Sequence, residues 1–138
     1  MEQFEWNANY ATGVTEIDTQ HAYLFALVNR LIRYTAGTVD KSDLEHIIAE
    51  LEDYAGKHFS YEESVMKQAG YEHLEEHMKK HETLRAQLSL YAAELKAGGL
   101  NIRDFVEFMK TWLRLHILRE DMKYLPAVAR LRDGSSTP

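Results

Sequence analysis

His58 to His81, HFSYEESVMKQAGYEHLEEHMKKH, is the stretch that decides the fold. It holds His58 and Glu62 four residues apart, a turn signal at Gly70, and then His77 and His81, again four apart. Side chains at this spacing lie on one face of an α-helix, so each pair can point toward a single place. Two helices joined at Gly70 would bring the pairs together, which predicts a metal site inside a helical bundle.

Such pairs are also common on the wet faces of helices, where they bind nothing. The two interpretations differ in whether the residues lie on the apolar stripe, because a buried polar side chain needs a partner. The stripe that begins at Leu44 continues without a break through His58, Glu62 and Val65. An ionised glutamate on a core stripe is costly unless a cation holds it.

Hydrophobic periodicity predicts four helices with short connections. Asp18 is expected to cap the first helix, Ser42 with Glu45 the second, and Asn101 the fourth. The expected bounds are residues 19–36, 42–68, 71–97 and 102–123. This pattern is typical of an all-α protein, an up-down-up-down four-helix bundle.

The segments outside these helices complete a single expected domain over residues 1–138. Residues 1–17 have no helical period and carry large apolar side chains, so we expect an ordered N-terminal arm. Pro126 suggests a break, followed by a short helical segment at residues 127–132.

Composition excludes several classes of protein. The sequence has no cysteine, which rules out thiolate metal sites and disulfides. A net charge of -6 argues against nucleic acid as a partner. No apolar run is long enough to span a membrane, and the N-terminus does not resemble a signal peptide, so a cytoplasmic location is expected.

The seven histidines divide into two classes. His46 and His73 fall off the apolar stripes and are expected on the surface. The other five fall on the stripes of the four helices, at His21, His58, His77, His81 and His116. Core histidines with ordinary partners usually occur singly, so five that converge, together with Glu62, favour metal binding. On the fourth helix, spacing alone makes Glu120 a better ligand than Asp121. Glu120 follows His116 by four residues, whereas an ideal helix turns Asp121, five residues on, away from His116.

These residues resemble the ligand pattern of the hemerythrin family. The order is His21, His58-x-x-x-Glu62, His77-x-x-x-His81 and His116-x-x-x-x-Asp121, which matches all seven ligand positions of the family. The segment GVTEIDTQHAYLF around His21 is similar to the bacterial branch, the bacteriohemerythrins. The resemblance favours Asp121 over Glu120. It therefore predicts a widened, π-like turn between His116 and Asp121, since one extra residue per turn restores the common face.

The resemblance implies two non-haem iron ions as the cofactor. His77, His81 and His116 would hold one iron, His21 and His58 the other, and Glu62 and Asp121 would bridge them. With one shared oxygen bridge, two six-coordinate metals then keep a single open position, on the iron with two histidines. The family pattern implies that dioxygen is stored there as hydroperoxide. The apolar residues that match the family's oxygen pocket are Leu24, Phe59, Trp112, Leu113 and Ile117.

Other metal chemistries fit the pattern less well. A tetrahedral zinc would use only four of the seven groups, and the metalloprotease motif is absent because Met78 follows His77. Ferritin-like enzymes use Glu-x-x-His pairs, and this chain has none.

Reversible dioxygen binding for storage or delivery is therefore the leading hypothesis, and we expect no enzymatic turnover. Dioxygen is the expected ligand, and an oxygen-consuming enzyme or a reductase the expected partner. Two alternatives remain: a module that senses oxygen or redox state, and a di-iron reductase for peroxide or nitric oxide.

Overall fold

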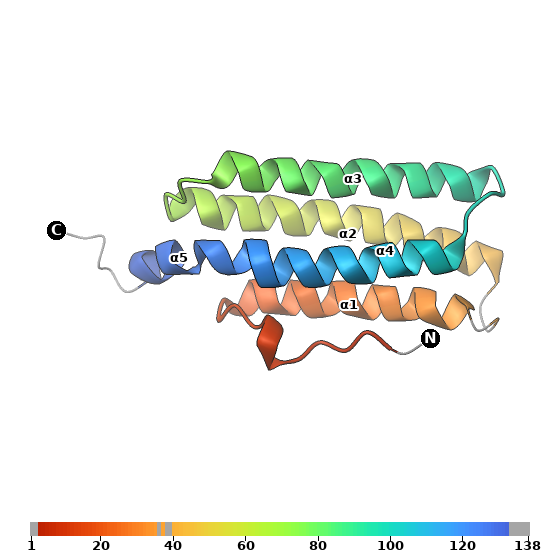
Figure 1. Ribbon diagram of the computed structural model, residues 1–138, viewed down its shortest axis with the longest axis horizontal. Helices are drawn as coiled ribbons and strands as arrows, with labels where there is room; N and C mark the ends of the chain where they lie inside the picture. Colours follow the sequence, from red (N-terminus) through yellow and green to blue (C-terminus); the bar gives the residue numbers. More distant parts are fainter. Residues whose placement is uncertain (1–2, 36, 38–39, 133–138) are drawn as a thin grey trace.

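The computed structural model describes residues 3–35, 37 and 40–132 and forms a helical bundle (Figure 1). The long helices are α1 (Thr15–Thr35), α2 (Lys41–Gln68), α3 (Leu74–Lys96) and α4 (Ile102–Leu115). α1 packs on α2 and α4, and α2 packs on α3. The predicted up-down-up-down four-helix bundle is confirmed.

The chain remains helical after α4. A π-turn (His116–Glu120) leads into a 3-10 turn (Asp121–Tyr124), which leads into α5 (Leu125–Arg132). The expected break at Pro126 is wrong, because this proline lies in the first turn of α5, where its missing N–H is not needed for a helical hydrogen bond. The short C-terminal helical segment is present and begins two residues earlier than expected.

Helix starts differ from the expected ones for local reasons. α1 begins at Thr15, so Asp18 lies in its first turn and is not its cap. The Asp18 carboxylate instead accepts hydrogen bonds from the Thr12 backbone N–H at 2.8 Å and from the Thr12 hydroxyl at 2.7 Å. α2 is capped by Asp40, which accepts from the Asp43 N–H at 2.9 Å, and not by Ser42. The expected end of the first helix at residue 36 lies outside the described residues.

The other two starts depend on one glycine and one asparagine. α3 begins at Leu74 and not at residue 71, because Gly70 adopts a φ of +68° and the chain turns before the helix can start. Asn101 caps α4 as predicted, since its side chain accepts from the Asp104 N–H at 3.1 Å.

The described part of the N-terminal arm, residues 3–14, is ordered, as predicted, and lies along α1 (Figure 1). Phe4 is buried and its ring stacks on Phe25, with centroids 3.9 Å apart. The Phe4 N–H donates to Asn29 Oδ1 at 2.6 Å, and Asn29 Nδ2 donates back to the Phe4 carbonyl at 2.9 Å. Arm and helix are therefore held by both apolar and polar contacts.

The core consists of two apolar clusters. The larger one includes Leu24, Phe59, Leu84 and Leu113 from the four helices, and the smaller one consists of Ile17, Met66, Tyr124 and Val128. On each helix the buried polar residues come between members or neighbours of the two clusters. The buried polar residues therefore form a layer with apolar side chains packed on both sides of it. None of the described helices is both long enough and apolar enough to cross a membrane.

The arm makes a testable contribution to stability. Phe4→Ala removes a buried ring and leaves a cavity against Phe25, so we expect the free energy of unfolding to fall by about 3 kcal/mol. Urea denaturation of the iron-loaded protein measures this change. Gln3→Ala, at an exposed neighbouring position, is the control and should stay within about 0.5 kcal/mol of the wild type. A loss below about 1 kcal/mol for Phe4→Ala would contradict a packed arm.

Candidate metal centre

Seven polar side chains are buried at one level of the bundle. They are the residues that the sequence predicted as ligands, and none is more than 6% exposed: His21, His58, Glu62, His77, His81, His116 and Asp121. His46 and His73, predicted as surface residues, are exposed. The apolar stripes therefore separated the five buried histidines from the two exposed ones correctly.

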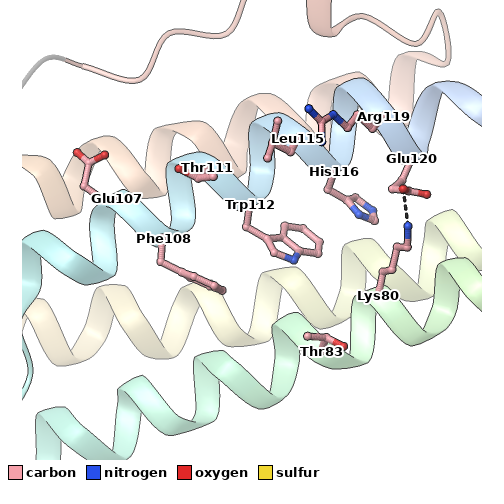
Figure 2. Close-up of a pocket in the computed structure, with 10 residues that line it drawn as sticks. All are labelled: Lys80, Thr83, Glu107, Phe108, Thr111, Trp112, Leu115, His116, Arg119 and Glu120. Carbon is pink, nitrogen blue, oxygen red and sulfur yellow. Dashed lines mark hydrogen bonds and ion pairs between the residues drawn. The ribbon is translucent and has the colours of Figure 1, made fainter.

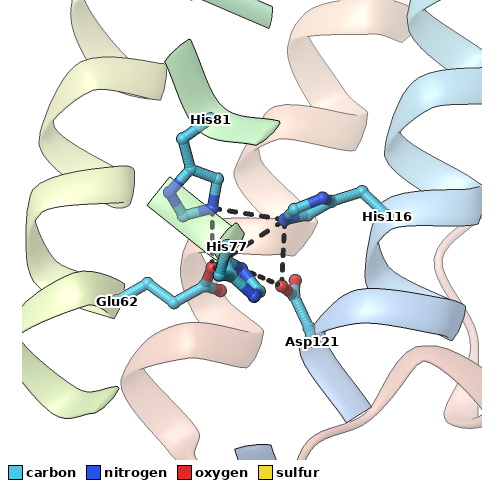
Figure 3. Close-up of side chains that lie close together, drawn as sticks. All are labelled: Glu62, His77, His81, His116 and Asp121. Atoms are coloured by element: carbon cyan, nitrogen blue, oxygen red, sulfur yellow. Dashed lines mark hydrogen bonds and ion pairs between the residues drawn. The ribbon is translucent and has the colours of Figure 1, made fainter. Parts of the chain in front are cut away.

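One group of donor atoms gathers around α3 (Figure 3). Glu62, His77, His81, His116 and Asp121 each offer a nitrogen or oxygen atom, and these atoms all lie within 4.8 Å of one another. The side chains come from α2, α3 and the turns after α4. This group holds three imidazoles and two carboxylates.

A second group lies toward α1. His21, His58 and Glu62 again place their donor atoms within 4.8 Å of one another. The Nε2 atoms of His21 and His58 are each 3.6 Å from Glu62 Oε2. This group holds two imidazoles and shares Glu62 with the first.

Both carboxylates face both groups. Glu62 Oε1 lies 3.0 Å from the Nε2 atoms of His77 and His81, while its other oxygen faces the second group. Asp121 Oδ1 lies 3.1 Å from the Nε2 atoms of His77 and His116, and Asp121 Oδ2 lies 3.1 Å from His21 Nε2. Each carboxylate thus directs one oxygen to each group, which is the arrangement of a bridging ligand.

The donor atoms are spaced as the ligands of a metal ion are. With metal–ligand bonds of about 2.1 Å, adjacent ligands of an octahedron lie about 3.0 Å apart and opposite ones about 4.2 Å, whereas ligands of a tetrahedron lie about 3.4 Å apart. In the first group the contacts of Glu62 Oε1 and Asp121 Oδ1 are 3.0 to 3.1 Å, and His116 Nε2 lies 4.0 Å from Glu62 Oε1. These values match the octahedral pattern, whereas the 3.2 Å between the Nε2 atoms of His81 and His116 and the 3.6 Å contacts of the second group lie closer to the tetrahedral spacing.

The π-turn decides which carboxylate points inward. The Asp121 N–H bonds to the His116 carbonyl, five residues back, so the extra residue brings Asp121 onto the face of His116. Asp121 is fully buried. Glu120 points outward and pairs with Lys80 and with Lys123. The predicted widened turn is confirmed, and spacing in an ideal helix alone would have chosen the wrong residue.

The chain matches a known family along most of its length. The family model for the hemerythrin HHE cation binding domain matches residues 12–128. The chain belongs to the hemerythrin family. It is 31% identical to the bacteriohemerythrin of Pseudomonas aeruginosa over 128 residues, which cover 93% of this chain and 83% of that protein. With the bacteriohemerythrin of Methylococcus capsulatus it shares 30% identity over 131 residues, which cover 94% of this chain and 99% of that protein.

Solved structures agree with this assignment. A crystal structure of wild-type hemerythrin superimposes with a TM-score of 0.84 at 30% sequence identity, covering 93% of this chain and 99% of that one. Hemerythrins bind non-haem iron, and the buried histidine and carboxylate cluster is of the kind that holds metal. Membership of the family supports an oxygen-binding role at non-haem iron.

The hemerythrin-like site has two carboxylates that stay ionised despite burial. Burial opposes the charge on Glu62, but hydrogen bonds from His21, His77 and His81 hold the pKa of its carboxyl well below the usual range. The pKa of Asp121 is also lowered, because the nearby His116 and His21 outweigh both burial and the charge of Glu62. Among the described residues neither oxygen of Asp121 accepts a well-aligned hydrogen bond. Two buried anions, one of which accepts no hydrogen bond in this part of the chain, fit a cationic metal ion between them.

The pKa values of the buried histidines shift in opposite directions. Burial lowers the pKa of His58 to about 4. Burial also opposes protonation of His21 and His77, but hydrogen bonds to Asp121 and Glu62 outweigh it and raise both pKa values to about 9. Without a metal, protons on His21 and His77 therefore provide the positive charge that the carboxylates need.

Three contacts around the predicted ligands were not predicted. Gln20 Oε1 lies 2.6 Å from His58 Nδ1, and Glu63 Oε2 lies 2.8 Å from His81 Nδ1. The buried Tyr124 hydroxyl donates to Glu62 Oε2 at 3.1 Å. The adjacency of Gln20 to His21 and of Glu63 to Glu62 was the available signal, because an outer partner usually holds the second nitrogen of a metal-bound histidine.

Two of the predicted oxygen-pocket residues stack on predicted ligands, and all five lie in or against the larger apolar cluster. Leu24, Phe59, Leu113 and Ile117 are buried in the larger apolar cluster, and Trp112 packs against it. The Phe59 ring stacks on His81 with centroids 3.9 Å apart, and Trp112 stacks on His116 at 4.3 Å. Trp112 and His116 also line a surface groove of about 630 Å³ beside Lys80 of α3 (Figure 2). The groove is therefore lined by His116, one of the predicted ligands, and by the Trp112 ring that stacks on it.

A matched pair of variants tests which carboxylate binds metal. Asp121→Asn removes the charge that faces both groups, so we expect iron affinity to fall by about 10- to 100-fold or more. Glu120→Gln removes the same charge one residue earlier, where the side chain points outward, and should leave iron content unchanged. Iron analysis after desalting measures both. Loss of iron from Glu120→Gln with retention in Asp121→Asn would reverse the assignment.

Proton release tests the electrostatics of the metal-free site. At pH 7 the raised pKa values of His21 and His77 keep both imidazoles protonated, and a metal ion must displace those protons. Ferrous iron should therefore release about two protons per metal-free chain, and its apparent affinity should rise with pH up to about 9. Anaerobic titration calorimetry in two buffers of different ionisation enthalpy counts the protons. Iron uptake without proton release would contradict the raised pKa values of His21 and His77.

Proposed function

We propose that this hemerythrin-family protein binds two iron ions in the buried layer and uses them to bind dioxygen reversibly, for storage or delivery. The observation that carries the proposal is the pair of shared carboxylates. Glu62 and Asp121 each direct one oxygen atom toward each histidine group, with most of these contacts at 3.0 to 3.1 Å. A single metal site would not need two such groups side by side.

The ligand assignment follows the two groups. His77, His81 and His116 would hold one ion, and His21 and His58 the other, with Glu62 and Asp121 between them. Irons held in this way would supply reversible electron donation to dioxygen. Nδ1 of His58 and of His81 donates to Gln20 and Glu63, which fixes Nε2 as the nitrogen that faces the centre.

The unequal number of histidines supports dioxygen binding on one particular side. The group with His21 and His58 offers one nitrogen fewer than the group on α3. With the same bridging ligands on both sides, the side with two histidines keeps a position for a small molecule. Leu24, one turn after His21, is the predicted pocket residue on α1 and is 1% exposed.

The surrounding residues suit binding and release. Phe59, Leu113 and Ile117 extend the dry packing around the ligands, so water has little access to carry protons in or out. Tyr124 adds a buried hydroxyl on the opposite side, where it donates to Glu62 and keeps the shared carboxylate in place. A ligand set of five imidazoles and two carboxylates stabilises high oxidation states less than a carboxylate-rich set would. We therefore assign a carrier and not an oxygen-activating enzyme.

Anaerobic reduction followed by cycles of air and nitrogen tests this function. We expect two irons per chain and a visible absorption band that appears with air and disappears when oxygen is removed, over several cycles. Irreversible bleaching with release of hydrogen peroxide, or steady consumption of a reductant, would favour a reductase instead. His58→Gln should lose the reversible band, whereas His46→Gln, at an exposed position on the same helix, should keep it.

A further inference from the structure

The outer nitrogen atoms of two buried histidines are held by chemically different acceptors. His58 Nδ1 lies 2.6 Å from the side-chain oxygen of Gln20, a neutral amide. His81 Nδ1 lies 2.8 Å from the side-chain oxygen of Glu63, a carboxylate. These two histidines belong to different groups of the metal centre. The centre is therefore asymmetric in its outer partners as well as in its number of histidines.

Each acceptor reaches across to the next helix. Gln20 precedes His21 on α1 and holds His58 of α2, and Glu63 follows Glu62 on α2 and holds a histidine of α3. The same residue pairs therefore provide one inner ligand and one outer partner. Among the described residues, Nδ1 of His21 and of His77 makes no hydrogen bond, so these histidines do not offset the difference.

A carboxylate and an amide affect an imidazole differently. A hydrogen bond to a charged acceptor is stronger than one to a neutral acceptor, and it draws the Nδ1 proton outward, which makes Nε2 a better electron donor. The contact at His81 is only partly exposed, since 24% of the Glu63 side chain is accessible, so solvent screens the charge incompletely. A more electron-rich ligand favours the ferric state of the iron that it binds.

We propose that Gln20 and Glu63 are positioning residues that give the two irons different reduction potentials. Glu63 lowers the potential on the side of His77, His81 and His116, and the neutral Gln20 keeps it higher on the side of His21 and His58. This inference rests on the proposed two-iron function. Its consequence is that the iron on the oxygen-binding side returns to the ferrous state more readily, which favours release of dioxygen.

Two isosteric exchanges test the proposal by anaerobic spectroelectrochemical titration. Each iron takes one electron from the electrode through a mediator, so reduction proceeds in two one-electron steps, the first on the side of His58. Glu63→Gln should raise the reduction potential of the second step by about 59 mV, equal to a tenfold change in the ratio of ferric to ferrous iron. Gln20→Glu should lower the reduction potential of the first step by about the same amount. Both variants should therefore reduce the difference between the two potentials. The mean of the two potentials should rise in Glu63→Gln and fall in Gln20→Glu.

Controls separate this effect from bulk electrostatics. Glu75→Gln and Gln68→Glu make the same changes at exposed positions on α3 and α2 and should leave both steps unchanged. The double variant Gln20→Glu with Glu63→Gln should keep the mean and reverse the order of the two irons, which the spectrum of the half-reduced protein reports. If both reduction potentials shift by the same amount, so that the difference between them is unchanged, the proposal is overturned.

Failure of this inference is distinguishable from failure of the proposed function. If the wild type does not hold two redox-active irons, the function fails. If it does, and both exchanges leave the difference between the two potentials unchanged, only the roles of Gln20 and Glu63 fail. If Glu63→Gln does not retain iron, then Gln20→Glu, which keeps an acceptor of the same length beside His58, decides alone by the direction in which its first step moves.

Discussion

Two ionised carboxylates in a dry interior are the constraint on which the rest of the structure depends. Glu62 and Asp121 are fully buried, and taking such charges out of water costs several kcal/mol each unless positive charge surrounds them. Five imidazoles from α1, α2, α3 and the π-turn after α4 surround these oxygens, and protons on His21 and His77, or a metal ion in their place, supply that charge. Metal binding and helix packing are therefore coupled, because a movement of any helix that carries a ligand changes the distance from its histidine to these oxygens.

The elements around the polar layer serve the same constraint. Apolar clusters lie on both sides of it, so the donor atoms are kept from water and strengthen each other's electrostatic interactions. The π-turn after α4 adds one residue where the fourth helix would otherwise turn Asp121 away from His116. Such a turn replaces regular helical hydrogen bonds with weaker geometry, and the approach of Asp121 to His21, His77 and His116 compensates for that cost.

Sequence periodicity predicted the four helices and the buried faces, because inward residues recur along each helix and the seven polar positions follow that recurrence. It could not predict the start of α1, which depends on the contact of Asp18 with Thr12, or the start of α3, which depends on the backbone of Gly70. Asp121 came from the family resemblance, since regular helical spacing favoured Glu120. Adjacency to predicted ligands made Gln20 and Glu63 candidate partners, but which histidine each contacts depends on the relative register of the helices, which periodicity does not set.

Anomalous diffraction at the iron absorption edge, from crystals of the iron-loaded protein, tests most directly whether these seven side chains jointly bind two ions. Two peaks are expected, one among His77, His81 and His116 and the other beside His21 and His58, with Glu62 and Asp121 contacting both. A single peak, a peak outside this layer, or either carboxylate turned away from the metal would contradict the two-iron centre.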